Sequence, residues 1–358
     1  MDLRELGWNR FFEEHFSELE HKGLVPARVV REHKHIYQVY TEQGPRPAEL
    51  AGKIGYDART KADFPTVGDW VAVKLIPNEE KVVIQQILPR KSKFTRKSVS
   101  RTDEEQIIAA NIETVFLVTG LDGDFNLRRI ERYLVLAWDS GARPAVILNK
   151  IDLCDDVEYC ISQIKFIAPE VPILPICAKD GRGIEALFEF LGSGKTVSLL
   201  GSSGVGKSTI INTILGIERQ AVAPVREDDS RGRHTTTYRE LILLPEGGAV
   251  IDNPGMRQLH VWAEQDESIS RAFEDIESIA ENCKFRDCTH EHEPGCAVLE
   301  ALEKGDIDYE RVENFKKLKE ELKLLEARQE QNLKAKERAQ QTRKNKRLRK
   351  KKKRRKKK

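Results

Sequence analysis

The chain has 358 residues, of which 39% are hydrophobic and 33% charged, and its formal net charge is +3. This length leaves room for two or three domains, each able to bury its own core. No apolar run approaches the roughly 18 residues of a membrane span, and the first residues lack the basic-then-apolar pattern of a signal peptide. We therefore expect a cytoplasmic protein with no membrane segment.

The small net charge hides a strong asymmetry along the chain. Residues 331–358 contain 17 Lys and Arg against one Glu, so that the rest of the chain is mildly acidic. Such a dense run of like charge repels itself and favours a disordered tail with a polyanionic partner. A tail that only confers solubility is the alternative.

The N-terminal third contains two kinds of secondary-structure pattern. Residues 1–23 predict a short amphipathic helix. Five β-branched runs separated by turn residues follow within 24–95, which favours a small β-barrel, most simply an OB-fold. Residues 88–98 are basic and predict a linker. Basic and aromatic residues interleave along the barrel in a pattern that suits RNA, although a solvated barrel face would look similar: Arg28, Arg31, Lys34, Lys53, Arg59, Lys61, Tyr37, Tyr40 and Tyr56.

Residues 96–262 alternate apolar strands with helices, which predicts a parallel sheet with crossovers. One strand ends in GSSGVGKS and is followed by a helical pattern. This spacing is that of a phosphate-binding loop, in which Lys207 reaches the β- and γ-phosphates and the Ser208 hydroxyl ligates Mg²⁺. The loop residues expected to contact nucleotide are Gly201, Ser202, Ser203, Gly204, Val205, Gly206, Lys207, Ser208 and Thr209.

Three further motifs sit at predicted strand ends. NKID (Asn149, Lys150, Ile151 and Asp152) offers a carboxylate that accepts both N1–H and the 2-amino group of guanine, which selects GTP over ATP. CAK (Cys177, Ala178 and Lys179) is its expected companion. In DNPG, Asp252 would hold Mg²⁺ through water and the Gly255 N–H would sense the γ-phosphate. The base-reading motifs thus precede the phosphate loop, which predicts a circularly permuted α/β P-loop G domain.

The residue that usually orients the attacking water is missing, because Met256 follows DNPG. Unaided hydrolysis should therefore be slow. In GRHTTT, His234 is the candidate to place that water and Thr236 the candidate ligand of Mg²⁺, with Lys207 completing the predicted catalytic set. A solvated loop histidine is equally compatible with the sequence, and Thr235 or Thr237 could replace Thr236.

Residues 263–330 contain a dense Cys/His group: Cys283, Cys288, His290 and Cys296. Three thiolates and an imidazole suit one closed, structural Zn²⁺ site in a helical domain, with His292 as an alternative ligand. Buried free cysteines are the competing interpretation. Disulfides are disfavoured by this clustering in a reducing compartment.

The order NKID, CAK, GSSGVGKS, GRHTTT and DNPG, between a barrel and a Cys/His cluster, resembles the ribosome small-subunit-dependent GTPase family, RsgA or YjeQ. The resemblance covers roughly residues 24–325. It implies hydrolysis of GTP to GDP during late maturation of the 30S subunit. We further expect a monomer that binds rRNA through the barrel, the zinc domain and the basic tail. DNPG and CAK depart from the family's usual DTPG and SAK. The alternative is a GTP-gated RNA-binding switch that acts on another structured RNA, with incidental hydrolysis.

Overall fold

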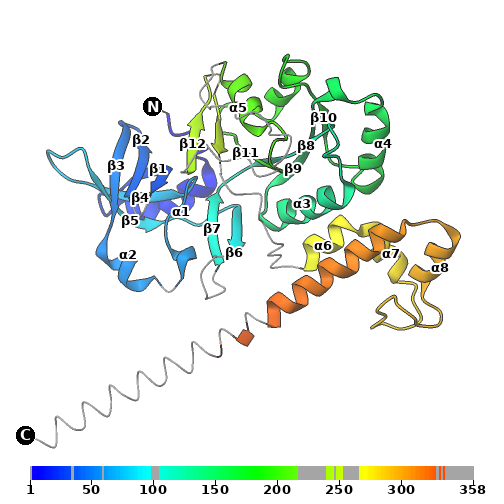
Figure 1. Ribbon diagram of the computed structural model, residues 1–358. Helices are drawn as coiled ribbons and strands as arrows, with labels where there is room; N and C mark the ends of the chain where they lie inside the picture. Colours follow the sequence, from blue (N-terminus) through cyan, green and yellow to red (C-terminus); the bar gives the residue numbers. More distant parts are fainter. Residues whose placement is uncertain are drawn as a thin grey trace, which may run out of the picture.

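The computed structural model has three folded parts: a barrel beside a central sheet, and a helical part beneath that central part (Figure 1). It describes residues 2–33, 36–58, 60–97, 105–216, 239–245, 247–252, 266–327, 330–331 and 334. The described residues contain no helix that is both long enough and apolar enough to cross a membrane.

The N-terminal part is a closed five-stranded barrel. Its order is β1-β2-β3-β5-β4, and a β1–β4 pairing closes the circle. Tyr37, Val39, Val71 and Val73 alternate along their strands and fill the interior, as the two-residue period of a strand requires. The strands are β1 (Val25–His33), β2 (Ile36–Thr41), β3 (Gly44–Leu50), β4 (Trp70–Leu75) and β5 (Val82–Ile87), with the short helices α2 (Gly52–Asp57) and η1 (Lys61–Asp63) between β3 and β4. This confirms the predicted barrel.

The N-terminal helix α1 (Arg10–Glu20) lies against the outside of the barrel. Asn9 caps it by accepting a hydrogen bond from the Phe11 N–H. Its buried face, which includes Phe12 and Phe16, packs with Trp70 of β4 in one apolar cluster. The amphipathic pattern of the sequence is therefore used to cover a barrel strand.

The predicted linker after the barrel is partly a strand. β6 (Lys93–Lys97) pairs antiparallel with β7 (Glu105–Ala110) in a separate two-stranded sheet. Phe94 is buried among residues of the main core. The sequence did not predict this strand. Its composition is basic, and its inward-facing residues are too few to produce a clear apolar run.

The central part is a sheet ordered β10-β9-β8-β11-β13-β12. All neighbours are parallel except the antiparallel pair β12–β13. β12 also pairs antiparallel with β1, so the sheet continues into the barrel. Its elements are β8 (Thr114–Gly120), α3 (Leu127–Asp139), β9 (Arg143–Asn149), η2 (Ile151–Leu153), α4 (Val157–Ile167), β10 (Ile173–Pro175), η3 (Ile184–Glu189), β11 (Thr196–Gly201), α5 (Lys207–Leu215), β12 (Arg239–Leu243) and β13 (Ala249–Asp252).

The C-terminal part is helical and packs on α3 (Figure 1). It contains α6 (Asp266–Ala272), α7 (Glu274–Ala280), α8 (Ala297–Lys304) and a helical stretch over residues 309–327. Phe273, Ile276 and Phe315 join the core cluster that includes Leu134 of α3. At the centre of this contact the buried Arg311 guanidinium pairs with Glu131 at 2.7 Å and with Asp275 at 2.8 Å.

Candidate nucleotide site and metal centre

The predicted phosphate loop connects buried β11 to the start of α5. Gly206 has φ of 96°, and a Cβ added there would lie 2.3 Å from the Asn149 amide nitrogen. A Cβ on Gly201 would lie 2.3 Å from the Val118 carbonyl oxygen. Only glycine fits at both positions, so the motif's fixed glycines are explained by backbone shape and close packing. The loop opens onto a helix N-terminus, where free N–H groups favour an anion.

Lys207, the first residue of α5, turns its ammonium group toward the loop. Its Nζ donates to the Gly201 carbonyl at 2.8 Å and to that of Ser202. The lysine charge is therefore held at the mouth of the loop. Ser203, Gly204, Ser208 and Thr209 are partly or fully exposed on the same segment, while Val205 is buried.

Asn149 joins the base-reading motifs to the phosphate loop. Its side chain is only 3% exposed. The amide nitrogen donates to the Val205 carbonyl at 2.8 Å, and the amide oxygen accepts from the Ala178 N–H at 3.0 Å. Thr213 of α5 also donates to the Ala178 carbonyl at 3.1 Å. NKID, CAK and the phosphate loop, whose order along the chain is permuted, thus meet at the one edge of the sheet where the parallel strands end.

The predicted guanine-reading end of this edge is open to solvent. Asp152 and Lys179 are exposed, and Ile151 is half-buried. The Asp152 carboxylate accepts a hydrogen bond from the Cys177 thiol at 3.2 Å. Burial raises the pKa of Cys177, which keeps it a protonated donor. The thiol of CAK is therefore a hydrogen-bond donor to the carboxylate of NKID.

Two acidic residues at the site were missed in the sequence. Asp122 forms an ion pair with Lys150, whose backbone has a left-handed φ of 64°. Asp124 accepts from the Ser202 hydroxyl at 3.2 Å and pairs with Arg129 at 2.8 Å. Both follow β8, so their position directly after an apolar parallel strand was the available signal.

The described residues reach the predicted switch region only at its edges. Asp252 is the last residue of β13 and is half-buried. His234, Thr236 and Gly255 lie outside the described residues, as does Met256.

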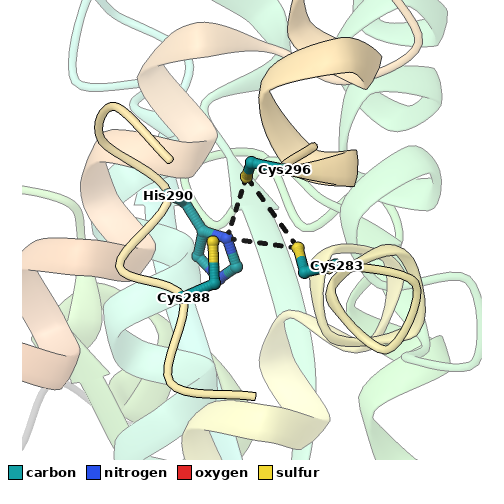
Figure 2. Close-up of side chains that lie close together, drawn as sticks. All are labelled: Cys283, Cys288, His290 and Cys296. Carbon is teal, nitrogen blue, oxygen red and sulfur yellow. Dashed lines mark hydrogen bonds between the residues drawn. The ribbon is translucent and has the colours of Figure 1, made fainter. Parts of the chain in front are cut away.

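The predicted metal ligands converge in the C-terminal part. Cys283 follows α7, Cys288 and His290 come from one loop, and Cys296 caps α8 (Figure 2). Their four ligand atoms all lie within 4.8 Å of one another. His292 is exposed and is not part of this group. The loop turns sharply at His290, where φ is 60°.

The spacing of these atoms fits a tetrahedral ion. Cys283 Sγ lies 3.8 Å from Cys296 Sγ, and His290 Nδ1 lies 3.7 Å and 3.3 Å from these two sulfurs. Four ligands around Zn²⁺ at normal bond lengths would be separated by about 3.5–3.8 Å. Burial lowers the pKa of His290, which favours the neutral imidazole that a metal needs. The cluster can therefore bind a metal ion.

The barrel does not present all of the predicted RNA-facing residues. Arg28 is 1% exposed and donates to the carbonyls of Leu6, Gly68 and Asn111. Tyr37 is also 1% exposed and faces the barrel interior. These two assignments were wrong: Tyr37 is buried by closure of the barrel, whereas Arg28 points out of the barrel and is buried at its junction with the N-terminal segment and the central part. Tyr40 and Arg31 are half-buried, Lys53, Lys61 and Tyr56 are exposed, and Lys34 and Arg59 lie outside the described residues.

A phosphate-type loop, its base-reading partners upstream in the chain and a flanking barrel define a circularly permuted P-loop GTPase. The family model described as RsgA GTPase matches residues 87–262, and one described as 50S ribosome-binding GTPase matches residues 196–352. The chain is 45% identical, over 90% of both chains, to the small ribosomal subunit biogenesis GTPase RsgA of Opitutus terrae. It is 44% identical, over 84% of both chains, to RsgA 2 of Lactiplantibacillus plantarum.

A solved structure agrees with these matches. The crystal structure of YjeQ from Thermotoga maritima is 30% identical, with a TM-score of 0.62, and the match covers 84% of this chain and 98% of that one. The chain therefore belongs to the RsgA GTPase family, and it is a GTPase. The resemblance stated from the motif order is confirmed.

Proposed function

We propose that this protein hydrolyses GTP to GDP in response to the small ribosomal subunit, late in that subunit's maturation. The observation that carries the proposal is Asn149, whose amide group connects the base-reading motifs to the phosphate loop at one sheet edge. The names of the relatives, small ribosomal subunit biogenesis GTPases, support the choice of partner. We place the activity in a cytoplasmic monomer that does not need a membrane.

Different residues of the chain bind the phosphates, the base and the metal ion of the GTP complex. The loop N–H groups and Lys207 hold the phosphates, and Asp152 reads the guanine edge. Asn149 and Ala178 position the loop, and the Cys177 thiol positions that carboxylate. Ser208, Thr236 and Asp252 would hold Mg²⁺, which neutralises phosphate charge when bound. His234 would orient the attacking water, and the Gly255 N–H would contact the γ-phosphate.

For the metal cluster we propose one structural Zn²⁺. Three thiolates and one imidazole form a closed set with the softness and geometry that this ion prefers. The loop that carries Cys288 and His290 is polar and largely exposed. A bound ion would supply the folding energy that such a loop cannot gain from an apolar core.

For rRNA we propose contacts from the exposed barrel residues Lys53, Tyr56 and Lys61, from the zinc domain and from the tail. Residues 341–358 carry 14 positive charges, and they lie outside the described residues. Their deletion should flatten the salt dependence of subunit binding, because fewer counterions are released. An unchanged salt slope would remove the tail from the RNA contact.

The deciding experiment measures GTP turnover with and without purified small ribosomal subunits. We expect slow basal turnover and strong stimulation. GTP-dependent binding of another structured RNA, with no stimulation of turnover by the subunit, would favour the GTP-gated RNA switch instead. Single-turnover hydrolysis by His234→Ala at saturating subunit tests its role, and we expect about a tenfold to thousandfold loss.

Two variants test the nucleotide site itself. Lys207→Ala should abolish GTP binding or turnover, whereas Lys195→Ala should change neither, because Lys195 precedes the opposite end of β11 and donates to the Glu189 carbonyl. Asp152→Asn should weaken GTP binding and improve binding of xanthosine triphosphate, whose base offers the complementary edge. Unchanged GTP affinity in Asp152→Asn would remove NKID from the site.

A further inference from the structure

The barrel and the central sheet are joined at one seam, the antiparallel pair β1–β12. Arg31 lies opposite Glu240, and Glu32 lies opposite Arg239. The charges are reciprocal: Arg31 pairs with Glu240 at 2.6 Å, and Arg239 lies 3.7 Å from Glu32. Opposite-charge pairs facing each other across strands stabilise one register. No local pattern in the sequence indicates this seam, because the paired residues are separated by about 200 positions.

The same row continues to the nucleotide site. On the other side of β12, Glu240 lies directly opposite Asp252, the last residue of β13. Residues directly opposite in neighbouring strands have their side chains on one face of the sheet. Arg31, Glu240 and Asp252 therefore form a row across three strands, from the barrel to the carboxylate proposed to hold Mg²⁺.

The charges in this row partly compensate one another. Two carboxylates directly opposite each other repel, so Glu240 beside Asp252 is unfavourable on its own. Arg31 neutralises Glu240 from the barrel side, and the Glu240 side chain is only 19% exposed. A shift of β1 by one residue would turn its side chains to the opposite face and break the pair. The position of the barrel strand and the charge beside Asp252 are thus linked.

We propose that Arg31 is a positioning residue for GTP hydrolysis, which acts through Glu240 on the Asp252 end of β13. β1 also pairs with β2 and β4 of the barrel. A displacement of the barrel caused by bound RNA would therefore be transmitted to this row through continuous strand pairing. This deepens the proposed function, on which it rests, by naming the path from the subunit to the hydrolytic site.

The test is a charge swap across the seam. Arg31→Glu and Glu240→Arg should each lower the ratio of stimulated to basal kcat by about fivefold or more. The double variant restores an opposite-charge pair and should return the ratio to within about twofold of wild type. Arg31→Lys, which keeps the cation, should retain most of the stimulation. The KM for GTP of Arg31→Glu should change far less than its stimulated kcat.

A second ion pair in the same barrel is the matched control. Glu49 of β3 pairs with Lys81, which directly precedes β5, and their side chains are 60% and 38% exposed. Both strands pair with other barrel strands. Glu49→Lys and Lys81→Glu should leave the stimulation ratio at the wild-type value. If Arg31→Glu does not fold, as judged by its melting curve, Arg31→Gln replaces it with the same expected direction.

Each outcome decides the matter. Wild-type stimulation in Arg31→Glu, or equal losses in the control pair, would overturn the positioning role alone. Failure of the double variant to recover would show that Arg31 contacts RNA directly, because residue 31 remains acidic in the swap. No stimulation of the wild-type protein would instead overturn the proposed function, and the positioning role with it.

Discussion

The two domains that flank the central sheet are attached to it by different kinds of contact. The barrel joins largely through main-chain groups, by the β1–β12 pairing and by the carbonyls that surround Arg28. The C-terminal helices join through side chains, with an ion network centred on Glu131 and Arg311 inside an apolar contact. The barrel attachment combines strand pairing with ion pairs across it, and the C-terminal attachment rests on side-chain packing and ion pairs.

This difference indicates how each domain can respond to the nucleotide site. Strand pairing resists sliding, because a one-residue shift turns every side chain to the other face. Side-chain networks can exchange partners: Glu131 is contacted by Arg128, Arg311 and Asn314. We infer that the barrel transmits small displacements faithfully, whereas the C-terminal helices can be repositioned by changing single contacts.

The largest effect should come from removing the metal, which tests whether the C-terminal part folds independently of the seam. Cys288→Ser should release about one Zn²⁺ per chain and loosen residues 283–296, since structural zinc contributes on the order of 10 kcal/mol. GTP affinity should stay close to wild type. Metal analysis and hydrogen exchange measure these results, with Cys154→Ser, outside the cluster, as the control. A wild-type protein without zinc would contradict the assignment.

The next effect concerns the buried ion network. Arg311→Met leaves Glu131 and Asp275 without their shared cation, and breaking such a buried pair costs about 3–5 kcal/mol. Urea unfolding measures the loss. In the same contact, Arg132→Gln removes a half-exposed pair with Glu321 and should cost about 1 kcal/mol or less. Equal losses in both variants would show that burial does not distinguish the two pairs.

A smaller loss is expected at the barrel side from Arg28→Met. Burial lowers the pKa of Arg28 to about 10, while Glu113 and Asp69 partly offset this. Removing the guanidinium leaves three carbonyls without this donor, and we expect a loss of about 2–3 kcal/mol. Thermal unfolding measures it against Arg46→Met, which removes exposed contacts in β3. Stability equal to that of the control would mean that Arg28 does not hold the junction.

Much of the candidate site could be predicted from sequence. The phosphate loop, NKID, CAK and the four metal ligands are short motifs whose spacing is dictated by the chemistry they perform, and their order alone indicated the permutation. Asp122 and Asp124 were missed because a lone carboxylate after a strand carries no spacing signal. His234 and Thr236 remain predictions, since no described residue bears on them.

The sequence by itself determined which motifs are present, their order and the alternation of elements, because each depends on residues that are close in the chain. Only the tertiary structure decided which face of a strand lies inside. Arg28 and Tyr37 follow the same pattern as exposed barrel residues, yet barrel closure buries Tyr37 and the junction with Leu6 and Asn111 buries Arg28. The row Arg31, Glu240 and Asp252 likewise depends on pairing between distant strands. Register between such strands is set by packing and charge across the whole sheet, and no local pattern records it.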